Sequence, residues 1–119
     1  MNSFDVFRGS QNKKGQVLKV RSVGLAYCDE SSQIGEIHIN DLPHQLFYIY
    51  AEESINHTFD YTIFIQDRST EELIPVGVGY LLVGDNAGLI RLDWDFYNNS
   101  NIYINLTPQN NKTSLGLAA

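Results

Sequence analysis

Two aspartates that flank the single tryptophan, Asp93 and Asp95, have the spacing in this sequence that best fits catalysis. They stand at positions i and i+2 of the alternating stretch LIRLDWDF, so both side chains would project from one strand face, ~6.5–7 Å apart. That separation suits the two carboxylates of an inverting glycosidase. However, the next strand is expected to place Tyr103 and Asn105 on the same face, and nothing there would bury a carboxyl and raise its pKa. We therefore interpret the aspartates as a solvent-exposed face held by cross-strand contacts with asparagine and tyrosine.

A calcium site is the alternative for the same aspartates. The spacing of Asp93, Asp95 and Tyr97 does not follow an EF-hand loop, which also requires a glycine at its sixth position and a closing glutamate. Asp85 and Asn86, in a neighbouring predicted loop, could add oxygen ligands. Calcium binding explains these aspartates less well than solvent exposure does. We therefore predict no metal site.

The remaining residue types that support catalysis are few and scattered. His38, His44 and His57 fall on different predicted elements without metal-ligand spacing. The lone cysteine, Cys28, stands beside two acids in AYCDE, which would raise its pKa and not activate it. A glycine-rich phosphate loop and a GxSxG elbow are both missing from the sequence. We expect a non-catalytic protein with no cofactor.

The elements that would position these residues are strands, because the dominant period of apolar residues is two. Between Val20 and Val23 the apolar positions change parity, which predicts a bulge at Ser22 or Gly24. Along 88–96 the inward parity includes Trp94, which we predict to be a core anchor. About eight strands are expected, at residues 4–7, 16–27, 34–40, 46–51, 58–67, 74–83, 88–96 and 101–107.

Eight short strands with hairpin-length connections fit a two-sheet sandwich or a closed barrel. Because eight is the number of strands in a jelly roll, we predict an all-β, antiparallel two-sheet β-sandwich that is jelly-roll-like. A chain of 119 residues suits one domain. We assign this domain to residues 1–107 and expect residues 108–119 to form a flexible C-terminal tail.

Two predicted strands are apolar on both faces, LFYIYA from Leu46 and IPVGVGYLLV from Ile74. Such strands are covered twice, by their own core and by a loop or a neighbouring subunit. Phe47, Tyr48 and Tyr50 on the first strand are therefore candidates for an assembly interface. Glycine weakens a strand interior, so Gly77 and Gly79 on the second must leave space for something. Internal packing against aromatic rings is the preferred use, and a groove for a sugar or a partner's backbone is the alternative.

Charge is distributed unevenly along the chain, which has a formal net charge of −6. Residues 1–21 carry five basic side chains and one acid, a net +4, whereas residues 22–119 carry a net −10. Such an uneven distribution fits either a solvated first hairpin or a basic arm that docks on an acidic surface. We assign a basic N-terminal arm to residues 1–21, in which Arg8, Lys13 and Lys14 are interface candidates. A body this acidic would be repelled by phosphates, so we do not expect nucleic acid as a partner.

These observations favour a non-catalytic structural protein that assembles through protein–protein contacts, with itself or within a larger assembly. A decoration, cement or tail component of a virus particle would fit this description. The alternative is a carbohydrate-binding module, which the tyrosine and asparagine content supports and which would take a glycan. The N-terminal stretch MNSFDVFRGSQNKKG lacks an apolar h-region, so we expect synthesis in the cytoplasm without a signal peptide. No segment approaches the ~20 apolar residues of a membrane helix, and we expect no membrane partner.

Overall fold

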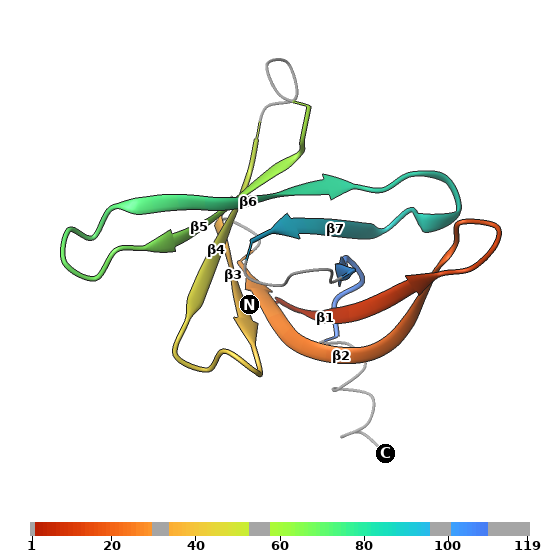
Figure 1. Ribbon diagram of the computed structural model, residues 1–119, viewed down its shortest axis with the longest axis horizontal. Helices are drawn as coiled ribbons and strands as arrows, with labels where there is room; N and C mark the ends of the chain where they lie inside the picture. The colour runs from red at the N-terminus through yellow and green to blue at the C-terminus, as the bar shows by residue number, and fades with distance from the viewer. Residues whose placement is uncertain (1, 30–33, 53–57, 96–100, 110–119) are drawn as a thin grey trace.

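The protein is a closed barrel of eight antiparallel strands, each hydrogen-bonded to the next along the chain (Figure 1). The computed structural model describes residues 2–29, 34–52, 58–95 and 101–109. A 3₁₀ turn, η1 (Gly84–Asn86), connects β6 to β7. The strands are β1 (Asn2–Gln11), β2 (Val17–Cys28), β3 (Ile34–Ile39), β4 (Leu46–Ala51), β5 (Tyr61–Gln66), β6 (Leu73–Leu81), β7 (Leu89–Trp94) and β8 (Ile102–Asn105).

The predicted two-sheet, jelly-roll-like sandwich is wrong. The last strand pairs with the first, with Val6 opposite Ile104, Phe7 opposite Tyr103 and Arg8 opposite Ile102. This pairing closes the sheet on itself and removes the two edges that separate sheets would leave. A jelly roll also needs long crossovers between sheets, whereas every connection here joins neighbouring strands. The predictions of an all-β chain, antiparallel pairing and eight strands are confirmed.

Side chains of inward parity form the core of the barrel, as expected for eight strands. The Trp94 side chain is only 6% exposed, and its ring lies 4.8 Å from that of Phe47, centroid to centroid. Trp94 is therefore a core anchor, as predicted. The core cluster includes five side chains with no exposed surface, Val6, Ile37, Phe47, Ile63 and Ile102.

Strand β2 is irregular in the predicted region, although the bulge lies between Ser22 and Gly24 and not at either residue. Its pairing with β1 passes from Val6–Gly24 to Phe7–Ser22, so Val23 is the extra residue. A second shift leaves Val20 as an extra residue nearer the β1–β2 turn. Bulges of this kind bend a strand and increase its twist. The strong curvature of β2 is visible in Figure 1.

Candidate interaction surfaces

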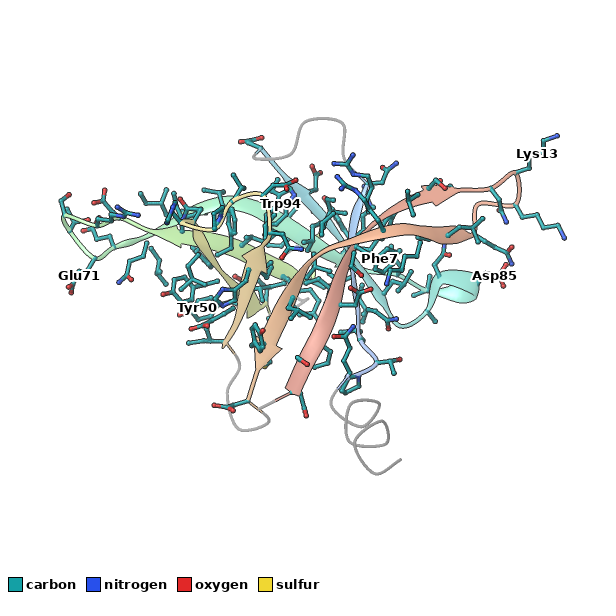
Figure 2. All side chains as sticks on the ribbon, turned by 90° about the horizontal axis from the view of Figure 1, so that it is seen from below. Phe7, Lys13, Tyr50, Glu71, Asp85 and Trp94 are labelled. Atoms are coloured by element: carbon teal, nitrogen blue, oxygen red, sulfur yellow. The ribbon has the colours of Figure 1, made fainter. Side chains whose placement is uncertain are left out.

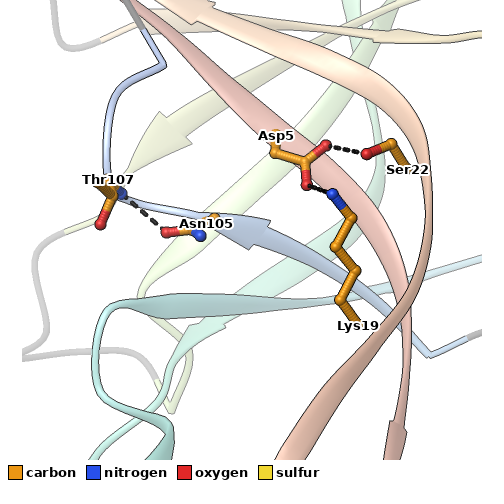
Figure 3. A network of polar contacts seen from close by, with 5 residues as sticks. All are labelled: Asp5, Lys19, Ser22, Asn105 and Thr107. Atoms are coloured by element: carbon orange, nitrogen blue, oxygen red, sulfur yellow. Dashed lines mark hydrogen bonds and ion pairs between the residues drawn. The ribbon is translucent and has the colours of Figure 1, made fainter. Parts of the chain in front are cut away.

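Asp93 and Asp95 are both exposed, as predicted, on either side of the buried Trp94. The predicted cross-strand neighbours of these aspartates are wrong, because the register of β8 against β7 differs from the expected one. Tyr103 lies opposite Arg91, and Asn105 lies opposite Leu89. The Asn105 carboxamide oxygen instead accepts a hydrogen bond from the Thr107 backbone N–H at 2.9 Å, which ends the strand (Figure 3). The two carboxylates therefore do not contact asparagine or tyrosine in the way we expected.

His38 and Cys28 have local partners, whereas His44 is an exposed residue of the β3–β4 turn. The His38 ring lies 3.3 Å from the Glu36 carboxylate on the outside of β3. The Cys28 thiol donates to the carbonyl oxygens of Asp29 and Ile34 at 3.3 and 3.7 Å. His57 lies outside the described residues. Within the described ranges, no three His, Cys, Asp or Glu side chains are grouped so that they could hold a metal ion.

Three of the predicted interface residues lie in the barrel wall or interior. Phe47 is fully buried against Trp94. A Cβ added to Gly77 would meet the Trp94 Cβ at 2.5 Å, and one added to Gly79 would meet the Ile90 Cγ2 atom at 3.1 Å. These glycines therefore allow internal packing, the use that we preferred for them.

Tyr48 and Tyr50 point to the outside of β4, where they form an apolar face with Phe64 of β5. Tyr48 lies directly opposite Phe64, and the Tyr50 and Phe64 rings meet edge to face with their centroids 5.3 Å apart. All three side chains are partly exposed. Exposed Ile34 is opposite Tyr50 on the neighbouring strand. We call Tyr48, Tyr50 and Phe64 the outer aromatic face.

This face adjoins an acidic turn between β5 and β6. The turn holds Asp67, Glu71 and Glu72 with one base, Arg68. The Asp67 carboxylate accepts hydrogen bonds from the Ser69 N–H at 2.8 Å and its hydroxyl at 2.7 Å, and from the Thr70 N–H at 3.2 Å. These bonds, those from Ser69 first, lower the pKa of Asp67 below the ordinary aspartate value. We call residues 67–72 the acidic tip.

The predicted basic arm is part of the barrel. Residues 2–11 form β1, and residues 17–21 begin β2, so only the turn between them projects. Lys13 and Lys14 are exposed in this turn, whereas Arg8 faces inward opposite Ile102. The Arg8 Nε is buried and has no hydrogen-bond partner among the described residues. Arg8 is thus separated from the two lysines with which it was predicted to act.

One of the basic residues is neutralised within the hairpin. The buried Asp5 carboxylate forms an ion pair with Lys19 Nζ at 2.7 Å and accepts a hydrogen bond from the Ser22 hydroxyl at 2.7 Å (Figure 3). The exposed positive charges that remain on the hairpin are Lys13, Lys14 and Arg21.

Apolar side chains accompany these charges on the same hairpin. Leu18 is 52% exposed and Val20 is 60% exposed, on strand β2 beside the turn. We call residues 13–21 the basic tip. Figure 2 shows Lys13 of this tip and Glu71 of the acidic tip at opposite ends of the molecule, with Tyr50 toward the Glu71 end.

A contact that sequence reasoning missed anchors the basic tip. The Asn86 side chain of η1 accepts a hydrogen bond from the Val17 N–H at 2.8 Å and donates one to the Gly15 carbonyl at 3.0 Å. The only sequence signal was the turn-forming run Gly84-Asp85-Asn86, which predicts a loop but not its partner. The basic tip is therefore attached to the β6–β7 connection.

Comparison with known protein families, curated proteins and solved structures found no match to this chain. No helix in the described ranges is long and apolar enough to cross a membrane.

Proposed function

We propose that this protein is a non-catalytic assembly protein in which the basic tip of one copy binds the acidic tip and outer aromatic face of the next. The observation that carries the proposal is that each end of the molecule combines charged side chains with exposed apolar side chains. Lys13 and Lys14 accompany Leu18 and Val20 at one end, and acidic residues accompany the outer aromatic face at the other. Contiguous apolar surface and exposed aromatic side chains are typical of protein interfaces.

The two parts of the contact have different physical roles. Opposite charges attract over ~8–10 Å at 0.1–0.15 M salt, so they orient two copies before the copies touch. Burial of Leu18 and Val20 against Tyr48 and Phe64 would then hold the contact, since the hydrophobic effect is not screened by salt.

A contact between two different surfaces of the same chain repeats head to tail. It generates a closed ring if the rotation between copies closes, and a filament if it does not. A decoration, cement or tail component of a virus particle needs such repetition. The narrower form of the proposal is that this protein is a component of that kind. The acidic tip can equally receive a basic surface of another protein in a larger assembly.

Sedimentation velocity tests this proposal with variants of the outer aromatic face. We expect the unmodified chain to associate with increasing concentration, and Phe64→Ser to remain monomeric at the same concentrations. Tyr80→Ser is the matched control, because Tyr80 is an outward aromatic on β6 that contacts Arg91 and not the outer aromatic face. Circular dichroism verifies that each variant is folded. Equal association of all three proteins would refute a contact through the outer aromatic face, and a monomer under every condition would refute self-assembly.

A carbohydrate-binding module is the second candidate, and one observation favours it. A groove of about 430 Å³ on the outside of β2 and β3 is lined by Tyr27, Glu36, His38 and Asn40. The Tyr27 and His38 rings meet edge to face at 5.2 Å between centroids. An aromatic ring beside a carboxylate and an amide is a suitable surface for a sugar. Tyr27→Ala would abolish glycan binding if this candidate holds, while Phe64→Ser would leave it intact.

A further inference from the structure

The barrel interior is not filled evenly from end to end. At the end of the barrel nearer the β3–β4 turn, the large rings of Phe47 and Trp94 pack together. At the other end, neighbouring strands present small residues toward the interior. Cys28 of β2 lies opposite Gly35 of β3, and Ala51 of β4 lies opposite Tyr61 of β5. Small side chains on adjacent strands leave a space that the opposite wall must fill or that a ligand can occupy.

That space is a pocket with a volume of about 160 Å³. Small residues form one wall, including Ala26, Cys28 and Gly35, and bulkier apolar side chains such as Phe4 and Leu106 form the other. No lysine, arginine, aspartate or glutamate is among the described residues that line it. A cavity of roughly 150 Å³ with an apolar lining stays dry and binds benzene. The pocket is therefore large enough for one six-membered ring.

Three lining residues carry a polar side-chain group, and one of them, Tyr27, has its ring against His38 on the outer side of β2. Tyr61 contributes a phenol and Cys28 a thiol. Burial, then the charge of Asp60 and then Cys28, raises the pKa of Tyr61 above 10.0. Tyr61 is therefore a neutral phenol at physiological pH and can donate a hydrogen bond.

We propose that this pocket is a binding site for a small, uncharged, monocyclic or short-branched apolar molecule that carries one hydrogen-bond acceptor. The ring or alkyl group occupies the apolar space, and the acceptor oxygen faces Tyr61. A charged ligand is excluded, because an ion transferred into an apolar pocket without a partner loses its hydration energy. The site is separate from the outer aromatic face and the two tips, since Tyr48, Tyr50, Phe64 and Lys13 do not line it.

Benzyl alcohol and benzoate are a suitable pair of probes, because they share a ring and differ in charge. We expect benzyl alcohol to bind with a Kd of roughly 0.1–1 mM, in the range of a well-fitted ligand of about eight non-hydrogen atoms. Methyl NMR would show shifts at Ile90 and Ile104, which line the pocket, and not at Ile39, which does not. Benzoate should cause no saturable shift. Saturable shifts of equal size with both probes would contradict the proposed class of ligand.

Cys28 supplies an independent readout, since it is the single cysteine of the chain. Saturating benzyl alcohol should slow alkylation of Cys28 by iodoacetamide, and benzoate at the same concentration should not. This measurement needs no substitution, so it remains decisive even where a pocket variant does not fold. An unchanged alkylation rate, together with unshifted methyl groups at several millimolar benzyl alcohol, would overturn the proposal.

The last comparison uses a variant in which an added side chain fills the pocket. Ala51 lines the pocket but is itself exposed, so Ala51→Phe can add a ring there without displacing the core. We expect this variant to bind benzyl alcohol at least about tenfold more weakly. Ala87→Phe, at an exposed position after η1, adds the same ring outside the pocket and should bind like the unmodified chain. Equal affinities of the two variants would show that the probe binds elsewhere.

Discussion

Gly77 occupies a place where the barrel wall tolerates no side chain. It lies opposite Trp94 on the neighbouring strand, and an added Cβ would meet the Trp94 Cβ at 2.5 Å and the Asp93 carbonyl oxygen at 2.6 Å. Gly79, two residues along, would place a Cβ no closer than 3.1 Å to its neighbours. The buried tryptophan and the glycine are thus one packing unit.

This packing predicts a graded response to alanine. Gly77→Ala should lower the free energy of unfolding by about 1–3 kcal/mol, the range for overpacking a well-filled core. Gly79→Ala is the matched control and should lower the free energy of unfolding by less, because the Ile90 and Tyr61 side chains need to move only slightly. Urea denaturation followed by tryptophan fluorescence measures both. A smaller loss for Gly77→Ala than for Gly79→Ala would contradict the proposed packing.

Asp67 gives a prediction about pH at the same scale. Its pKa is lowered by hydrogen bonds from Ser69 and Thr70, so folding favours the ionised carboxylate. The stability that it contributes is fully present above its unfolded pKa, near 3.8, and is lost as the pH falls through the lower folded pKa.

Carboxyl NMR should therefore show Asp67 titrating below the ordinary aspartate value. Ser69→Ala removes the hydroxyl donor and should raise the pKa of Asp67 toward that value. Ser10→Ala changes an exposed serine on β1 and should leave it unchanged. A pKa of Asp67 that is the same in both variants would show that Ser69 does not stabilise the carboxylate.

At the scale of elements, local patterns predicted the strands but not their closure. Alternation located β7, with Ile90, Leu92 and Trp94 inward, and the change of parity located the bulge to within one residue of Val23. These features depend on residues near one another in the chain. The β1–β8 pairing joins Phe7 to Tyr103, and no periodicity along the chain reports which distant strand completes a sheet.

The extent of β1 was underestimated for a related reason. We expected a strand over 4–7, yet it continues to Gln11 because the polar residues that follow pair with β2. The N-terminal charges were consequently assigned to an arm. A truncation of residues 1–14 would remove a wall strand containing the fully buried Val6, so charge substitutions are the appropriate test of the basic tip.

The same limit applies to the candidate sites. Tyr48 and Tyr50 could be recognised because a strand that is apolar on both faces must turn one face outward. The pocket could not be, since it is assembled from residues whose neighbours depend on the register of several strands. Asn86 illustrates this point, because its partner Gly15 lies 71 residues away in the chain.

The contact made by Asn86 yields a prediction for the hairpin. Asn86→Ala leaves the Val17 N–H and the Gly15 carbonyl without this partner, and should lower the free energy of unfolding by about 0.5–1.5 kcal/mol. Hydrogen exchange should accelerate at Val17 more than at the core residue Ile37. Asn105→Ala removes a local bond to Thr107 and should leave Val17 exchange unchanged. Slow exchange at Val17 in both variants would show that the hairpin does not depend on Asn86.

At the scale of the whole molecule, the two tips determine how copies can meet. The net charge of −6 makes two copies repel on average, so association at low salt requires local complementarity. Lys13 and Lys14 in one tip and Glu71 and Glu72 in the other supply it. Figure 2 shows Lys13 and Glu71 at opposite ends of the molecule. At ~1 M salt the screening length falls to about 3 Å, and we expect the orienting part of the contact to weaken there.

A charge exchange between the tips tests head-to-tail assembly most directly. Lys13→Glu with Lys14→Glu makes both tips of a copy acidic, and Glu71→Lys with Glu72→Lys makes both tips basic. Sedimentation velocity at low salt should show each double variant alone as a monomer, because like charges then meet. An equimolar mixture should sediment as larger species, because opposite tips alternate along the assembly. A mixture that sediments like its separate components, or a double variant that associates alone as the unmodified chain does, would contradict the account.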